Sequence, residues 1–111
     1  MPEAVEDLII RLSDEDREKR EVAGASLGDW LASTARAGRD FDPVARALIR
    51  ALLTEDDHDV QEEIANSLGY LVEYGKITRE LVQPLLMHQT HLDPRVAAHV
   101  ADLIDASTWP S

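Results

Sequence analysis

Apolar residues recur every three or four positions along most of the chain, which is the spacing of one buried face of an α-helix. Short stretches rich in acids, glycine or proline separate the segments that carry this spacing. The pattern predicts six helices, over about residues 2–12, 16–37, 43–53, 58–74, 78–88 and 94–106.

Signals for helix starts and stops support these boundaries. Asp42 and Asp93 each precede a proline, which combines a capping carboxylate with a residue suited to the first helical turn. Gly38 is predicted to end the second helix, because glycine adopts the left-handed conformation that closes many helices. Pro84 must either lie in the first turn of the fifth helix or kink it. Met87 is predicted to belong to the buried face of that helix.

The pattern repeats along the chain. Residues 12–14 match residues 53–55 at an offset of 41, and residues 26–28 match 67–69 at the same offset. A third copy fits an offset of 36, at which the apolar positions 60, 64 and 68 coincide with 96, 100 and 104. A period near 40 with two helices per unit predicts an all-α fold, a short α-solenoid of three helical hairpins. Its units span residues 2–38, 42–75 and 78–106 in a single domain, 1–106, and a tail follows at 107–111.

Several stretches resemble HEAT repeats, and the resemblance covers nearly the whole chain. They are Leu-Val-Gln-Pro-Leu-Leu at 81–86, Asp-Pro-Arg-Val at 93–96, and Asp-Val leading to Ala-Asn-Ser-Leu-Gly-Tyr-Leu over 59–71. The resemblance implies HEAT-like hairpins in right-handed stacking, with the second helix of each unit lining a concave binding surface. In that family a basic residue follows the turn valine and builds an Asp–Arg ladder. Here Arg20, Gln61 and Ala97 hold that position, so a continuous ladder is not predicted.

Acidic residues outnumber basic ones by 22 to 11, which gives a formal net charge of -11. This charge repels phosphate backbones and anionic lipid headgroups, so we expect neither nucleic acid nor membrane as a partner. It also accelerates encounter with a cationic protein. The alternative interpretation is that the acids only keep a small domain soluble.

The chain has no cysteine, which removes disulfides and thiolate zinc sites and suits a reducing compartment. The first residues are acidic, unlike a secretory signal, and no apolar run approaches the roughly 20 residues that span a bilayer. We therefore expect a cytoplasmic protein.

Candidate partner-binding residues come from the acidic turns before the second helix of each unit and, by resemblance, from the exposed side of those helices. They are Asp14, Glu15, Asp16, Glu21, Asp29, Asp56, Asp57, Asp59, Glu62, Glu63, Tyr70, His99 and Asp102. Carboxylates at helix starts also cap free N–H groups and offset the helix dipole, which explains one acid per turn better than three. An exposed tyrosine among acids suits an aromatic anchor, whereas the alternative for Tyr70 is an ordinary half-buried tyrosine.

Residue patterns for catalysis or metal binding are missing. His88 and His91 with Asp93 or His99 have poor ligand spacing and no HExxH pattern. The acidic turns lack the glycine and distal glutamate of a calcium loop. The sequence has no glycine-rich phosphate loop, no Gly-x-Ser-x-Gly elbow, and no His-Glu pair of the kind found in HEAT-like di-iron hydroxylases. We predict no enzyme activity, no cofactor and no metal.

The resulting hypothesis is a non-catalytic module that binds a cationic protein, such as an immunity or inhibitor protein that neutralises a basic toxin or nuclease. It is expected to be a monomer when free. The alternative is a structural or adaptor subunit that associates through the apolar flanks of its first and last helices. Trp109 in the tail is expected to cover the flank of the last hairpin, because the ends of solenoids require capping.

Overall fold

The computed structural model describes residues 5–74, 77–88 and 92–107. Within these ranges the chain forms six helices and no strand element. They are α1 (Val5–Arg11), α2 (Arg17–Arg36), α3 (Asp42–Thr54), α4 (His58–Tyr74), α5 (Arg79–His88) and α6 (Pro94–Ala106). The all-α prediction is therefore confirmed for the described residues, and right-handed solenoid stacking stays a prediction.

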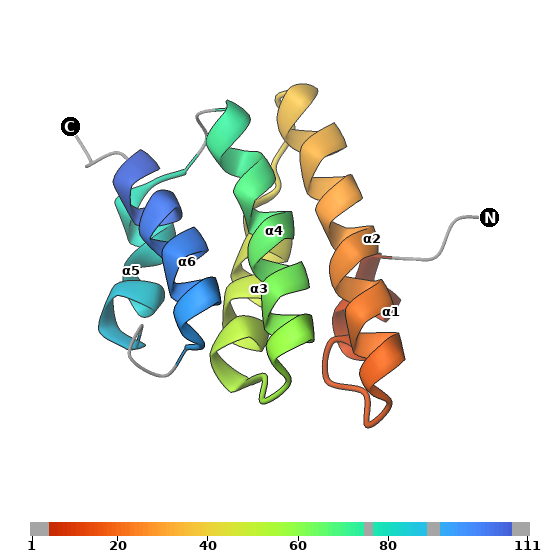
Figure 1. The fold of residues 1–111 in the computed structure, drawn as a ribbon. Helices are drawn as coiled ribbons and strands as arrows, with labels where there is room; N and C mark the ends of the chain where they lie inside the picture. Colours follow the sequence, from red (N-terminus) through yellow and green to blue (C-terminus); the bar gives the residue numbers. More distant parts are fainter. Residues whose placement is uncertain (1–4, 75–76, 89–91, 108–111) are drawn as a thin grey trace.

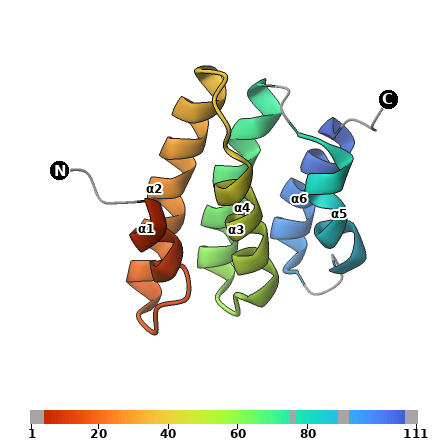
Figure 2. The same cartoon turned by 180° about the vertical axis from the view of Figure 1, so that it is seen from behind.

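The helices form two layers. Helices α2, α4 and α6 lie side by side in the layer that faces the viewer in Figure 1, and α1, α3 and α5 lie in front in Figure 2. Each helix of one layer packs on its neighbour in sequence in the other, and α2 packs on α4 and α4 on α6. The result is three hairpins side by side, and the most extensive packing is between α2 and α4.

One hydrophobic core extends through all the hairpins. Leu27, Leu48, Leu68 and Leu85 are buried on α2, α3, α4 and α5, and Val100 continues the core on α6. Their spacing follows the apolar periodicity of the sequence, because one stripe of each helix faces the junction between the layers. Polar residues at the turns are thereby left along one edge of the molecule.

Most predicted helix ends agree with the structure. The carboxylate of Asp93 caps α6 by accepting a hydrogen bond from the N–H two residues ahead, and Pro94 lies in the first turn. Gly38 follows the end of α2 with a φ of 71°, in the left-handed region. Asp42 is not a cap, because Phe41 precedes α3 without a side-chain cap and Asp42 is already helical. Its carboxylate pairs instead with Arg46, one turn later.

Helix α5 corrects one prediction. Met87 is 70% exposed and not buried. It follows the buried Leu85 by two residues, which places it about 200° further round the helix and away from the core. Pro84 lies inside α5, beyond its first turn. The start of the predicted first helix and Trp109 lie outside the described residues.

Candidate acidic binding surface

The excess negative charge belongs to one of the two layers. Among the described residues, α2, α4, α6 and the turns before them carry 16 acidic and five basic side chains, whereas α1, α3, α5 and the connection before α3 carry five of each. The first layer thus accounts for the formal net charge of -11. Its acids are Asp14, Glu15, Asp16, Glu18, Glu21, Asp29, Glu55, Asp56, Asp57, Asp59, Glu62, Glu63, Glu73, Asp93, Asp102 and Asp105. Its bases are Arg17, Lys19, Arg20, Arg36 and Arg95.

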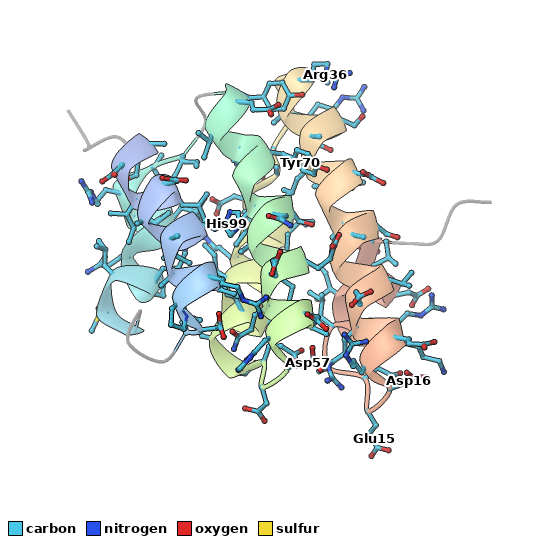
Figure 3. All side chains as sticks on the ribbon, viewed as in Figure 1. Glu15, Asp16, Arg36, Asp57, Tyr70 and His99 are labelled. Atoms are coloured by element: carbon cyan, nitrogen blue, oxygen red, sulfur yellow. The ribbon has the colours of Figure 1, made fainter. Side chains whose placement is uncertain are left out.

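The turns that carry most of this charge share one edge. The N-terminal ends of α2, α4 and α6 lie together at the bottom of Figure 1, and Glu15, Asp16 and Asp57 are labelled at the same edge in Figure 3. This arrangement follows from the repeat, because each hairpin turns from its first to its second helix at the same end. The predicted juxtaposition of the acidic turns is therefore present.

Some of these carboxylates cap the N-termini of the helices. Asp16 and Asp57 each accept a hydrogen bond from the backbone N–H two residues ahead, at 2.9 Å in both cases. Asp57 also accepts from the N–H of Val60 at 3.1 Å, and this bond is the main reason that the pKa of Asp57 lies below its ordinary value. For Asp93, the N–H of Arg95 is the main cause of a lowered pKa.

Arg17 neutralises some of the negative charge along this edge. Its guanidinium donates to Asp57 at 2.7 Å and to Asp59 at 2.8 Å, so it joins the start of α2 to the turn before α4. It also lies 3.4 Å from Glu21 on its own helix. The hydrogen bond with Asp57 is the main reason that the pKa of Arg17 is raised. Three of the predicted binding acids are thus already paired within the molecule.

A buried ion pair lies beneath this edge. Arg20 makes a two-pronged contact with Glu55, with Nε–Oε2 at 2.9 Å and Nη2–Oε1 at 3.1 Å. The side chain of Glu55 is only 4% exposed. Arg20 also donates to the backbone carbonyls of Asp14 and Glu15. Its guanidinium therefore holds its own turn and the next turn together.

Gln61 has the same function one unit later. Its Nε2 donates to the carbonyl of Glu55 at 2.6 Å, and its Oε1 accepts from the N–H of Asp93 at 3.4 Å. Gln61 and Glu55 stand at an offset of 41 from Arg20 and Asp14, so the amide copies the contacts of the guanidinium. Arg20 and Gln61 thus form two successive polar bridges between turns, which are not an Asp–Arg ladder, and Ala97 has no polar side chain to extend them.

The acids whose side chains form neither an ion pair nor a hydrogen bond within residues 5–74, 77–88 and 92–107 define the free part of the surface. They are Glu15 and Asp56 in the turns, and Glu18, Asp29, Glu63, Asp102 and Asp105 on the helices. Asp14 accepts the N–H of Asp16 at 2.8 Å, and Glu62 lies 4.0 Å from Arg95. Five of the predicted binding acids are therefore available, namely Glu15, Asp29, Asp56, Glu63 and Asp102.

Tyr70 and His99 lie on the exposed side of this layer. Tyr70 is 38% exposed on α4, and His99 is exposed on α6. Figure 3 places Tyr70 over the middle of the layer, with His99 towards the α6 side. Neither side chain has a hydrogen bond to the rest of the described protein. Both side chains are thus accessible, and their part in binding a partner stays a prediction.

The described residues contain no group of three His, Cys, Asp or Glu side chains placed to hold a metal ion. His91 lies outside these residues. Every helix in the described part of the chain is too short or too polar to cross a membrane.

Comparisons with protein-family models, with curated proteins and with solved structures give no match to the chain. The candidate surface therefore has to be interpreted from its own geometry and charge.

Proposed function

We propose that the chain is a non-catalytic, HEAT-like binding module that recognises a cationic protein through the layer formed by α2, α4 and α6. The observation that carries this proposal is the charge difference between the layers, 16 acids against five bases on one side and five of each on the other. Helix capping does not require such an excess, since one carboxylate suffices for each N-terminus. A one-sided field instead steers and orients a cationic partner.

The contact surface we propose consists of the free acids together with Tyr70. Glu15 and Asp56 project from the turns, while Glu63 and Asp102 lie on the helices. Free carboxylates keep their charge for a partner, whereas Asp57 and Asp59 are compensated by Arg17. Tyr70 adds a large amphipathic side chain of the kind that often dominates binding energy.

The partner we favour is a basic toxin or nuclease, with this chain acting as its immunity or inhibitor protein. A surface that attracts nucleic acid is positively charged, and an acidic layer competes with nucleic acid for it. The proposal includes right-handed stacking of the hairpins and a cytoplasmic location.

The test is charge reversal on one layer against the other. Asp56→Lys/Glu63→Lys changes two free acids of the layer formed by α2, α4 and α6. Glu6→Lys/Glu80→Lys makes the same net change on the layer formed by α1, α3 and α5, which we call the outer layer. Both variants and the wild type serve as bait for proteins from the source cells, and association rates with the captured protein are measured at several salt concentrations. We expect a basic partner that the first variant loses and the second retains.

Asp57 is left unchanged in this test, because its loss also breaks the contact with Arg17 and the cap of α4. Circular dichroism should show the same helix content in all three proteins. A captured protein that is acidic, or that binds both variants equally, contradicts the proposal.

A structural or adaptor role is the second candidate. Ile10, Val22 and Met87 are 67%, 61% and 70% exposed, and they belong to the first and last hairpins. Such apolar side chains at the two ends suit self-association. A concentration-dependent dimer in sedimentation, disrupted by Val22→Lys or Met87→Lys, favours this role over the acidic binder.

A further inference from the structure

A cavity of about 460 Å³ lies between the first two hairpins, where α1 and α3 end. Both helices run towards the lower edge in Figure 2, so the cavity lies beside the acidic turns on the side of the outer layer. Its apolar lining comes from Ile9, Leu12, Ala47 and Ala51. The contact surface proposed above shares Asp56 with this cavity but not the rest of its lining.

Acceptors approach this cavity from both turns. Asp14 and Asp56 line it, one from each turn. Asp14 uses Oδ1 to accept the N–H of Asp16, which leaves its second oxygen available. Asp56 forms no hydrogen bond or ion pair with the described residues. Helix α3 ends here with no basic residue in its last turn, and Thr54 Oγ1 donates to the carbonyls of Arg50 and Ala51. The remaining carbonyls of this helix end add partial negative charge. The cavity therefore combines an aliphatic wall with a negative rim.

The cations that line the cavity do not cancel this rim. Arg20 makes four hydrogen bonds, two to Glu55 and two to backbone carbonyls. Arg50 is exposed on the α3 side and is a free cation among the described lining residues. The unpaired carboxylate of Asp56 and the second oxygen of Asp14 thus oppose the guanidinium of Arg50. Arg50 can donate to a main-chain carbonyl of a bound peptide.

We propose that this cavity receives a lysine side chain of the cationic partner, with its four-carbon stem along Leu12 and Ala51 and its ammonium between Asp14 and Asp56. This inference rests on the proposed function and extends the contact surface round the edge of the turns. An ammonium donates in three directions, which suits acceptors from two turns and a helix end. The planar guanidinium of arginine suits a single carboxylate better.

The experiment uses the whole chain and a hexalysine peptide as the probe. Nitrogen–proton NMR spectra are recorded during titration with hexalysine, hexaarginine and hexaglutamate at low salt. We expect hexalysine to shift amide signals of residues 9–14 and 47–56 most strongly. We expect hexaarginine to shift them less and hexaglutamate not at all.

Two double variants with the same net charge distinguish hexalysine binding in the cavity from attraction by the overall negative charge of the protein. Asp14→Asn/Asp56→Asn removes the two rim charges, and the asparagine at 14 keeps an oxygen for the N–H of Asp16. Glu73→Gln/Asp105→Asn removes two exposed charges at the far ends of α4 and α6. We expect on the order of ten-fold weaker hexalysine binding for the first variant and less than about two-fold for the second, since partly enclosed pairs outweigh exposed ones.

A third variant leaves the charge unchanged. Ala51→Phe fills the cavity from the half-buried wall of α3 and should remove the shifts at residues 9–14, with helix content checked by circular dichroism. The lysine site is overturned if the two double variants lose hexalysine affinity equally. It is also overturned if hexaarginine shifts the signals of the cavity residues more than hexalysine does. Hexalysine that fails to bind the wild type at all contradicts the proposed function itself.

Discussion

The two junctions between the hairpins use the same repeat positions in different ways. At the first junction, between α2 and α4, a Cβ atom added to Gly28 would overlap Ser67 Oγ, which donates a hydrogen bond to the carbonyl of Gly24 at 2.8 Å. At the second junction, between α4 and α6, the equivalent Gly69 has no atom within 4 Å of such a Cβ. The first pair of helices therefore approaches more closely than the second.

The polar contacts differ in the same direction. Arg17 and Arg20 bridge the first junction with charged contacts of 2.7 to 3.1 Å to carboxylates. Gln61 bridges the second with one neutral contact of 3.4 Å. His58 lies 3.1 Å from Asp93. Arg95 lies 4.0 Å from Glu62, which is the longest of these contacts. A guanidinium and an amide thus fill equivalent positions. The comparison teaches that a repeat can keep its bridging geometry while the strength of the bridge changes from unit to unit.

The largest expected effect comes from breaking the buried pair of the first junction. Arg20→Met leaves Glu55 buried without its partner, and we expect a loss of about 3 kcal/mol in the free energy of unfolding, measured with urea. At the second junction Gln61→Met removes only neutral hydrogen bonds, so its loss should be smaller, about 1–2 kcal/mol.

The control for this comparison is the double variant Arg20→Met/Glu55→Met. Replacing both charges by apolar side chains of similar size should restore most of the lost stability, because no unpaired charge remains. If Arg20→Met proves no more harmful than Gln61→Met, the first junction does not depend on its charged bridge in the way that the geometry indicates.

The second prediction concerns the close approach of α2 and α4. Gly28→Ala forces the new methyl group against Ser67 and should cost about 2 kcal/mol, even though alanine favours the helix. Gly69→Ala is the matched control at the second junction, where the added methyl group meets open space. It should stabilise the protein by about 0.5–1 kcal/mol through helix propensity alone.

Thermal melting or urea unfolding of both variants gives the comparison directly. Gly28→Ala/Ser67→Gly should recover part of the loss, since it removes the Cβ that the new methyl group meets at 2.6 Å. Two alanine variants with equal stability contradict the difference in helix spacing between the junctions.

Local signals in the sequence predicted the helices well. The apolar period identified the buried faces, the Asp-Pro step at 93–94 marked the start of α6, and Gly38 marked the end of α2. These features depend on neighbours within one or two turns, which the sequence displays directly. The prediction that Met87 is buried was wrong, because it did not take account of the angle between Met87 and Leu85 round the helix.

The candidate surface was predicted only in part, because the pairing of charges depends on contacts between units. The acidic edge followed from the repeat, but the burial of Glu55 against Arg20 was not predicted. Arg17 neutralises Asp57 and Asp59 from 40 or more residues away. A signal was present in the offset of 41, which aligns Arg20 with Gln61 and Asp14 with Glu55 as two copies of one polar bridge.

The smallest expected effect is a loss of stability at low pH, and it should be similar for the capping carboxylates at the two junctions. Asp57 and Asp93 both have a pKa below the ordinary value of 3.8, and a backbone N–H is the main cause in each case. The unfolded chain therefore binds protons at a higher pH than the folded chain does. The resulting stability is complete above pH 3.8 and is lost as the pH falls through the folded pKa.

Acid unfolding of the wild type, Asp57→Asn and Asp93→Asn checks this expectation. Each asparagine removes one titrating carboxylate, so each variant should lose less stability than the wild type between pH 5 and pH 2. The two variants should be similar, since capping is common to both turns. Salt distinguishes the remaining ionic part, because screening should weaken the contribution of Arg17 at Asp57 while the hydrogen bond from Val60 persists. If both variants lose as much stability as the wild type between pH 5 and pH 2, the acid sensitivity comes from other carboxylates.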